Sequence, residues 1–319
     1  MAVSGTAAFN YNLDQIVRSA LRKIGAIAAG ETPSPQMFQD AKDQLNILIK
    51  AWDATGLHIW TEEEAILFTQ PSQVSYTLGG NTPDSCAATS FTQTSLTANA
   101  SAGATTISVL SATGFAANYY VGIPLSTGYI FWTQESGAPS GTTINLTTPL
   151  TSAATAGSYV YVYQSQIIRP LRVLGGRRYY IPSSIDTPLI ALSRIDYRNL
   201  PNKTTPGTIT QYFYDPRGGA ATQGVFYVWP APTDANSAVK FTYMRPIDDF
   251  VTSANTPDLP NEWLDAIVWN LALKLALEYD TPPQRYEMLK EQAVSSLDLV
   301  MGWDREPESI YFGVNFDQR

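Results

Sequence analysis

The feature that most constrains this chain is an abrupt change of composition in its middle. Residues 84–165 consist mostly of Thr, Ser, Ala, Gly and Tyr, and only Asp84 and Glu135 are charged. No Lys or Arg occurs between Ala51 and Ile168, so hydroxyl groups must keep the surface of this segment in solution. The residues on either side carry amphipathic patterns and many more charges. The change indicates a module inserted into a differently built core.

Short β-prone runs bounded by Gly, Pro, Asn and Ser fill the segment. They are Thr106–Val109, Tyr119–Ile123, Gly128–Gln134, Thr143–Thr147 and Ser158–Tyr163. Their spacing predicts a small barrel or sandwich whose two ends lie close together. We therefore expect an inserted all-β domain at 82–166, a core made of 1–81 and 167–301, and an extended C-terminal tail at 302–319.

Helical patterns occupy both ends of the core. The first helix is expected to begin at Asn12, a good N-cap, and to end at Gly25. The second is expected to begin at Ser34, with proline in its first turn, and to stop before Gly56. The short connection predicts an antiparallel hairpin. Two further helices are expected to begin after Pro260 and at Pro282-Pro283.

Strand patterns lie between the helices. Those predicted in the core are Ala65–Leu78 with a turn at Gln70–Gln73, a hairpin of Ile167–Leu174 and Arg177–Ile181 turning at Gly175-Gly176, and Gln211–Tyr214, Val225–Trp229 and Ala238–Met244, each followed by proline. The predicted fold class is α+β. It comprises a helical hub, formed by the N-terminal helix hairpin and the two C-terminal helices, with antiparallel β elements and an inserted small all-β domain.

Charge and cysteine content exclude several classes of protein. A net charge of −8 and a pI near 4.7 disfavour a nucleic-acid coat, because Lys and Arg must displace the counterions condensed on phosphates. A single cysteine, Cys86, excludes an intramolecular disulfide and a cysteine-built metal site, so we expect no metal and no cofactor. Residues 1–12 lack the pattern of a secretory signal, and the apolar stretch Ala266–Leu277 is too short to span a membrane.

The residues needed for most enzymatic mechanisms are missing from the sequence. His58 is the single histidine, so no Ser/His/Asp or HExxH arrangement is indicated, and no phosphate-binding glycine loop is present. Two carboxylates are sufficient for glycosidic cleavage. The acids to consider are Asp53, Glu62, Glu63, Glu64, Asp248 and Asp249. Because runs of charge are usually solvated faces, we predict no catalytic residue and keep a carboxylate hydrolase as an alternative.

One basic region stands out in this acidic chain. Its members, interleaved with tyrosines, are Arg169, Arg172, Arg177, Arg178, Arg194 and Arg198. Guanidinium groups form bidentate pairs with both phosphates and carboxylates, so the region could contact DNA or an acidic patch on a partner. The other interpretation, which we favour, is that these arginines occupy an exposed strand face and pair with acids of the same or a neighbouring subunit.

Ordered motifs outside the inserted segment resemble one family. They are Ala29-Gly30-Glu31-Thr32-Pro33, Trp52-Asp53-Ala54-Thr55-Gly56-Leu57, Ile195–Lys203, Tyr212–Pro216, Tyr227–Pro232, Tyr243–Phe250 and Leu259–Trp263, leading to Leu271-Ala272 and Glu278-Tyr279. In this order they resemble the head-to-tail adaptor proteins of tailed bacteriophages, also called connector proteins, tail accessory factors or packaged-DNA stabilisation proteins. Simpler members of that family lack the inserted segment, so its role is not implied.

The resemblance implies a structural virion protein made in the host cytoplasm and located at the head-tail junction. Such proteins form a ring, commonly of twelve copies, that binds the portal protein, extends the DNA channel, helps retain packaged double-stranded DNA and carries tail components such as the tail tube, nozzle or fibres. An extended C-terminal segment reaches the portal in the family. Here the candidates for that contact are Trp303, Tyr311, Phe312 and Phe316.

Two alternatives from other classes remain at this point. One is a tail-associated peptidoglycan hydrolase that uses a carboxylate pair. The other is a glycan- or receptor-binding β module carried on a scaffold. An acidic subunit agrees with the adaptor expectation, because a conduit through which DNA slides should repel phosphates rather than hold them.

Overall fold

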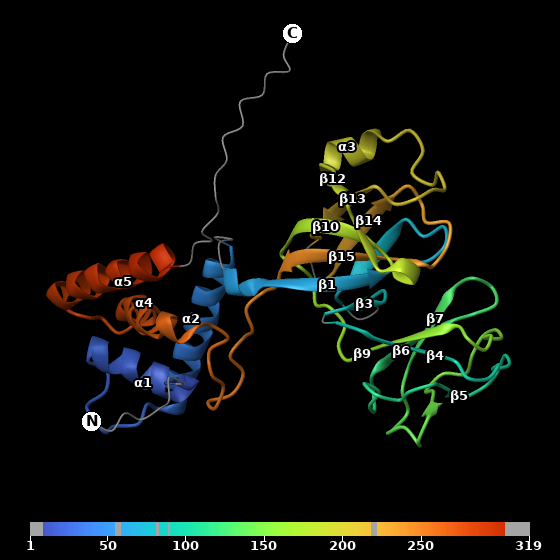
Figure 1. The fold of residues 1–319 in the computed structure, drawn as a ribbon. Helices are drawn as coiled ribbons and strands as arrows, with labels where there is room; N and C mark the ends of the chain where they lie inside the picture. The colour runs from blue at the N-terminus through green and yellow to red at the C-terminus, as the bar shows by residue number, and fades with distance from the viewer. Residues whose placement is uncertain (1–8, 55–58, 81–82, 89, 218–221, 304–319) are drawn as a thin grey trace, which may run out of the picture. The chain divides into compact units, whose positions relative to one another are not determined.

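The computed structural model describes residues 9–54, 59–80, 83–88, 90–217 and 222–303. Its chain divides into two units (Figure 1). The helical unit comprises residues 1–61 and 247–319, and the β unit comprises residues 62–246. Helices and antiparallel sheets are both present, so the α+β class predicted from the sequence is confirmed.

Four long helices form the helical unit where the sequence predicts them. They are α1 (Leu13–Ile24), α2 (Pro35–Asp53), α4 (Leu264–Ala276) and α5 (Pro283–Trp303), with the 3-10 turns η1 (Ile59–Thr61) and η3 (Asn261–Trp263). The Asn12 side chain accepts from the Gln15 amide, and the Gln15 side chain accepts from the Asn12 amide, which completes a capping box. Gly25 ends α1 at a φ of 83°, and Arg285 Nη1 donates to the Ile24 carbonyl there at 2.9 Å.

Helix α4 lies at the centre of this unit. α1 makes its most extensive contact with α4 rather than with α2, because the apolar stripe of α1 faces the almost wholly apolar α4. Trp263 is fully buried, and its ring meets those of Trp52 and Trp60 edge-on at centroid distances of 5.4 and 4.9 Å. Such pairs add about 0.5–1.5 kcal/mol each to the stabilisation from area burial.

Two sheets pack face to face in the β unit. The first has the order β11-β10-β15-β1-β3 and the second β12-β13-β14-β2. Their bounds are β1 (Glu62–Phe68), β2 (Ser75–Leu78), β3 (Cys86–Ala87), β10 (Arg172–Tyr180), β11 (Ile185–Pro188), β12 (Ile190–Ala191), β13 (Gln211–Asp215), β14 (Gly224–Trp229) and β15 (Ser237–Met244). Alternate residues of both sheets, including Leu67, Phe226 and Phe241, form the core between them. The 3-10 turn η2 (Ile181–Ser183) follows β10, and the short helix α3 (Arg194–Asn199) follows β12.

The predicted hairpin turn at Gly175-Gly176 is wrong. β10 runs through both glycines as one strand, and its pairing with β15 shifts between Val173 and Gly175. Leu174 is therefore the extra residue of a β-bulge. A Cβ on Gly176 would lie 3.0 Å from the Tyr212 ring of the facing sheet, so the glycine admits a close approach between the sheets instead of turning the chain.

The first predicted strand also differs in extent. β1 begins at Glu62, before the predicted start at Ala65, because all three glutamates pair with β15 in the ladder from Glu62↔Met244 to Phe68↔Ala238. Neighbouring residues of a strand point to opposite faces, so Glu63 and Glu64 are directed to different sides of the sheet. The turn near Gln70–Gln73 and the strand that follows it are confirmed.

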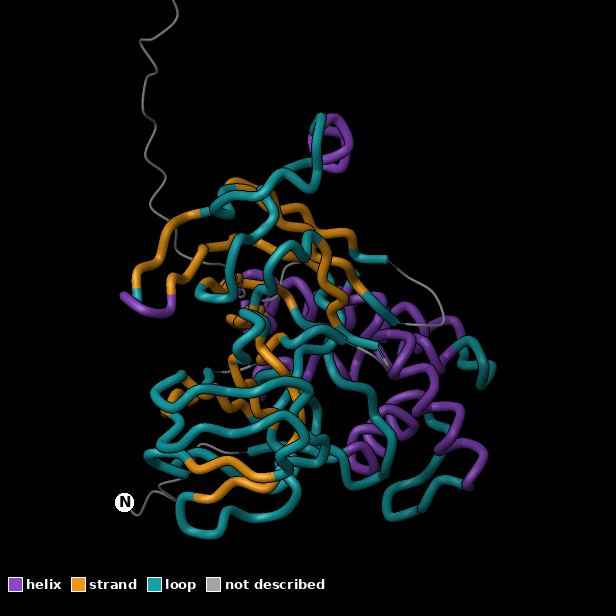
Figure 2. Tube along the Cα trace, turned by 90° about the vertical axis from the view of Figure 1, so that its right-hand side faces the viewer, coloured by secondary structure: helices purple, strands orange, loops and turns teal. Residues whose placement is uncertain are grey.

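The inserted segment contains a third sheet and a separate ribbon. The sheet has the order β4-β9-β6-β7, and β5 pairs with β8. Their bounds are β4 (Thr92–Ser95), β5 (Thr106–Ser108), β6 (Tyr120–Pro124), β7 (Ile130–Gln134), β8 (Thr143–Asn145) and β9 (Tyr159–Tyr163). The five runs predicted from the sequence all contain a strand, and β4 was not predicted. Loops make up much of the segment (Figure 2).

The ends of the inserted segment lie side by side. The Ala88 amide donates to the Ser165 carbonyl at 2.9 Å, and Ala87 forms a bridge with Gln166. The segment has an apolar core of its own, which includes Val121, Ile123, Ile144 and Val160. Its division from the rest of the chain at 82–166 stays a prediction.

Aromatic side chains join the inserted segment to the first sheet. Phe68 of β1 is 1% exposed, and its ring lies 4.8–6.2 Å from those of Phe91, Trp132, Tyr161 and Tyr163. Ile66, Ile181 and Ala238 of the core complete this cluster. The segment therefore covers an apolar patch on the outer face of the first sheet.

Candidate functional site

The glutamates considered as a carboxylate pair are held by separate partners. Glu63 accepts from Arg245 Nε at 2.8 Å and from the Tyr243 hydroxyl at 3.0 Å. Glu64 accepts from Arg177 Nη2 at 2.5 Å. The two carboxylates leave opposite faces of β1, so they cannot flank one scissile bond from the same side.

The aspartates considered with them lie in the helical unit. Lys50 pairs with Asp249 at 2.8 Å and with Asp53 at 3.6 Å, and its Nζ also donates to the Ile247 carbonyl at 2.7 Å. The Asp248 amide donates to Asp258 at 3.2 Å. These contacts connect α2 to the loop after residue 246, which indicates a structural role for the acids. His58 lies outside the described residues.

The six arginines of the basic region do not form one continuous patch. Arg177 and Arg178 are adjacent on β10 and point to opposite faces. Arg177 pairs with Glu64, and Arg194 of α3 pairs with Asp215 at 2.6 Å. Among the described residues the other four make no ion pair; they are Arg169, Arg172, Arg178 and Arg198.

Large apolar side chains are exposed in the same part of the β unit. Between β10 and α3 the exposed fractions are 40% for Leu174, 56% for Ile185, 62% for Ile190 and 71% for Ile195. The same stretch of chain contains arginines that make no ion pair among the described residues. Exposed apolar patches and arginine are both typical of protein interfaces. We call this region the β10–α3 surface.

The helical unit also exposes apolar side chains, and three of them lie on α5. Met288 is 68% exposed, Val294 53% and Leu299 78%, whereas Leu289, Ala293 and Val300 of the same helix are buried. One side of α5 therefore packs against its own unit, and the other side presents apolar groups to solvent. We call this second region the α5 surface.

Charge is distributed very unevenly between the two units. The helical unit contains 19 Asp and Glu against 10 Lys and Arg, whereas the β unit contains 9 against 10. The helical unit therefore carries −9 and the β unit +1, which together give the net charge of −8. A contact between the helical unit of one copy and the β unit of another would be electrostatically favourable.

The C-terminal aromatics predicted to bind a portal are only partly within the described chain. α5 continues to Trp303 and so includes the first two residues of the predicted tail. Tyr311, Phe312 and Phe316 lie outside the described residues. None of the described helices has the length and apolar composition needed to cross a membrane. In the described part of the chain no three His, Cys, Asp or Glu residues form a group that could hold a metal ion.

Comparison with protein families gives a match that spans these surfaces. The model of the SU10 adaptor protein family matches residues 132–309, more than half of the chain, from β7 through the β10–α3 surface to the end of α5. The chain belongs to the SU10 adaptor protein family. No curated protein matches it. Membership makes this chain a bacteriophage adaptor, a structural protein that is located in the virion and associates with other virion components.

The structure of this adaptor also reveals a group that the sequence patterns do not single out. Glu135, at the end of β7, is 0% exposed, and neither of its carboxylate oxygens has a hydrogen-bond partner among the described residues. Its backbone is satisfied, because its amide donates to the Tyr119 carbonyl and its carbonyl accepts from the Asn118 amide, both at 2.9 Å. Burial raises the pKa of the Glu135 carboxyl above its usual value of 4.5.

Replacing Glu135 by Gln is expected to stabilise the protein at neutral pH. The folded state holds the Glu135 proton more tightly than the unfolded state, so this group favours folding below pH 4.5 and loses that contribution as pH rises through the raised pKa. Removing the unpaired buried charge should raise the free energy of unfolding by about 1–3 kcal/mol at pH 7–8. Thermal unfolding between pH 4 and 8 measures the difference.

The paired carboxylate of Glu63 provides the control for this experiment. Glu63→Gln should lower stability at neutral pH, because it weakens the contacts to Arg245 and Tyr243. The increase in the free energy of unfolding that Glu135→Gln causes at neutral pH should become smaller as the pH is lowered towards 4. A gain of equal size at every pH would show that the ionisation of Glu135 is not its cause.

Proposed function

We propose that this chain is the head-to-tail adaptor of its phage. In this role a ring of subunits, twelve in the family it resembles, binds the portal protein, extends the DNA channel, helps retain packaged DNA and provides the platform for tail tube, nozzle or fibre proteins. The observation that carries the proposal is the family match over residues 132–309, which covers β10 to β15 of the core, the C-terminal helices and both apolar surfaces.

The unequal charge of the two units supports a head-to-tail ring. In such a ring each copy presents two different patches, one to each neighbour. The β10–α3 surface contains Arg172 and Arg198, which have no ion pair among the described residues, and it exposes Ile190 and Ile195. The α5 surface offers Met288 and Leu299 on a unit with net charge −9. Apolar anchors on both patches and opposite charge around them favour pairing between these two surfaces.

A second role of the helical unit follows from the same charge. An acidic surface repels DNA phosphates, so a channel bordered by helical units would let double-stranded DNA pass without tight binding. The arginines of the β unit that make no ion pair within the described chain are the alternative DNA-proximal groups. Helix α5 leads directly into the C-terminal tail, for which we propose contact with the portal through Trp303, Tyr311, Phe312 and Phe316.

The decisive experiment is to measure the mass of the purified protein with and without its portal ring. Native mass spectrometry or light scattering should show a closed ring in complex with the portal, together with loss of free subunits. A protein that stays monomeric when mixed with portal and leaves the portal mass unchanged would contradict the adaptor role at the head-tail junction. Wall-degrading activity of the pure protein, abolished by Glu63→Gln or Glu64→Gln, would instead support the hydrolase.

Charge placed on either apolar surface is expected to prevent ring formation. Ile195→Asp on α3 and Leu299→Asp on α5 change side chains that are 71% and 78% exposed, so the isolated subunit should fold normally. Each should weaken the subunit contact by about 2 kcal/mol or more, because a carboxylate would be buried against an apolar partner. Ile47→Asp on α2, which is 55% exposed and outside both surfaces, is the matched control. Rings that form equally well in all three variants would place the subunit interface elsewhere.

A further inference from the structure

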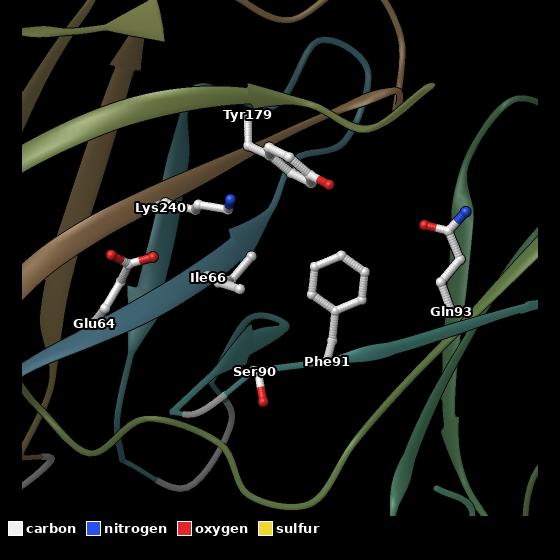
Figure 3. Close-up of a pocket in the computed structure, with 7 residues that line it drawn as sticks. All are labelled: Glu64, Ile66, Ser90, Phe91, Gln93, Tyr179 and Lys240. Carbon is white, nitrogen blue, oxygen red and sulfur yellow. The ribbon is translucent and has the colours of Figure 1, made fainter. Parts of the chain in front are cut away.

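A cleft of about 510 Å³ lies between the first sheet and the inserted segment (Figure 3). One wall comes from the core and consists of Glu64 and Ile66 of β1, Tyr179 of β10 and Lys240 of β15. The other wall comes from the inserted segment and consists of Ser90, Phe91 and Gln93. Neither the family match nor the proposed adaptor function assigns a role to this cleft.

The two charged residues that line the cleft, Glu64 and Lys240, each have a partner of opposite charge outside it. Glu64 is paired with Arg177, and Lys240 Nζ lies 3.4 Å from Asp186. Lys240 Nζ also lies 3.7 Å above the centroid of the Tyr179 ring. Two bases and two acids leave no net charge for attracting an anion or a cation. The cleft is therefore suited to a neutral ligand.

Hydrogen-bonding groups nevertheless remain available on both walls. Oε1 of Glu64 and the whole side-chain amide of Gln93 have no hydrogen-bond partner among the described residues. Both are planar groups that present two neighbouring polar atoms, and the amide can donate and accept at once. Vicinal hydroxyl groups, each of which also donates and accepts, match such groups.

An aromatic floor lies between these polar groups. Phe91 is half-buried, with its ring 5.2 Å from Phe68 and 6.4 Å from Tyr179, centroid to centroid. In Figure 3 the Phe91 ring stands between Gln93 on one side and Glu64, Ile66 and Lys240 on the other. Aromatic faces pack against C–H groups, so one ligand could use both the flat floor and the polar walls.

We propose that this cleft binds a neutral saccharide chain. A pyranose ring has an apolar C–H face, which would pack on Phe91 and Tyr179, and a rim of hydroxyls, which would bond to Glu64 and Gln93. The cleft is open to solvent, so a sugar within a longer polysaccharide can enter it without a free chain end. The adaptor thus contains a glycan-binding site at the junction of its inserted segment, in addition to its role in the ring.

The test uses the full-length protein and a printed array of neutral and anionic bacterial polysaccharides. A glycan that binds in the array is then titrated into the parent protein and into each variant to compare their affinities. Gln93→Ala should weaken binding about fivefold, because it removes one hydrogen-bonded pair at an exposed position. Phe91→Leu keeps an apolar side chain of similar size in the aromatic cluster but removes the flat face, and should weaken binding about tenfold.

Gln134→Ala is the matched control, since Gln134 lies on β7 of the same sheet and does not line the cleft. It should bind as the parent does. Binding of a neutral glycan that depends on Gln93 and Phe91 but not on Gln134 supports the proposal. The proposal is overturned if no neutral glycan binds, if anionic glycans are preferred, or if the Gln93 and Phe91 variants, shown to be folded by circular dichroism, bind as well as the parent. Ring formation is measured on the same samples, so that a failure of glycan binding can be told apart from a failure of the adaptor function.

Discussion

Replacing residues 89–164 by the two-residue turn Asn-Gly is expected to yield a protein that folds but aggregates. Ala88 and Ser165 already share a backbone hydrogen bond of 2.9 Å, so a tight hairpin turn can close the chain there. The deletion would, however, expose Phe68, Ile66 and Ile181, which are 1%, 6% and 3% exposed in the intact chain. Burial of each such side chain stabilises a protein by about 1.5–3 kcal/mol, so the free energy of unfolding of the β unit should fall by on the order of 5 kcal/mol.

A second substitution distinguishes aggregation through the uncovered apolar patch of the first sheet from failure of the core to fold. The deletion combined with Phe68→Ser should stay in solution and keep the helical circular-dichroism signal, because the helical unit has a separate core. Sedimentation and thermal unfolding of the two proteins measure the difference. If the single deletion is as soluble and stable as the parent, the aromatic cluster contributes little and the segment is fully autonomous. If the double variant loses its helical signal, the inserted segment is required for the core to fold.

Ending the chain after Trp303 is expected to abolish attachment to the portal. This truncation keeps α5 complete and removes Tyr311, Phe312 and Phe316. Anchoring aromatics contribute about 1–3 kcal/mol each when they enter pockets on a partner, so the loss of three should weaken binding by at least about a hundredfold. Binding of the truncated protein to immobilised portal rings at matched salt measures the effect.

Polar positions of the same tail supply the control. Ser309→Ala and Asn315→Ala should bind the portal as the parent does, whereas Tyr311→Ala or Phe316→Ala should each account for part of the loss. The truncated subunit should still form rings, because neither the β10–α3 surface nor the α5 surface is removed. If the truncated protein binds the portal as strongly as the parent, the contact lies instead on the helices of residues 260–300.

Helix positions are the part of the fold that could be read directly from the residues. Asn12 and Ser34 cap α1 and α2 at the predicted places, and Gly25 ends α1 in the left-handed conformation. These signals are local, since a cap satisfies amides within three residues and a stripe repeats within one turn. The five predicted runs of the inserted segment succeeded for the same reason, because short β-branched stretches between turn residues need little distant information.

The glycine pair shows where local information was insufficient. Gly175-Gly176 has the composition of a hairpin turn, yet it lies inside β10. The choice between turn and strand depends on β15, which pairs with both sides of the bulge, and on Tyr212, whose ring occupies the space that a side chain would need. Both partners are distant in the sequence, so no pattern around the glycines reports them.

The candidate site divides in the same way. The run Glu62–Glu64 and the six arginines were recognisable as unusual from composition, and the β10–α3 surface lies among those arginines in the chain. Which arginine pairs with which acid, and which face of the sheet each occupies, follows from the register between β1, β10 and β15. Of the residues that line the cleft, Glu64 belongs to the glutamate run and Tyr179 follows two of the arginines, whereas no sequence pattern marks Phe91, Gln93 or Lys240 as part of a site.

The sequence by itself determined the α+β class, the positions of the four long helices, five of the strands of the inserted segment and the family. These depend on periodicity, capping and ordered motifs, all of which operate over a few residues at a time. Only the tertiary structure decided the course of β10, the burial of the Glu135 carboxylate with no hydrogen-bond partner among the described residues, and the cleft between β1 and the inserted segment. These features arise where strands far apart in the chain pair and pack, because pairing register and burial are properties of two surfaces together.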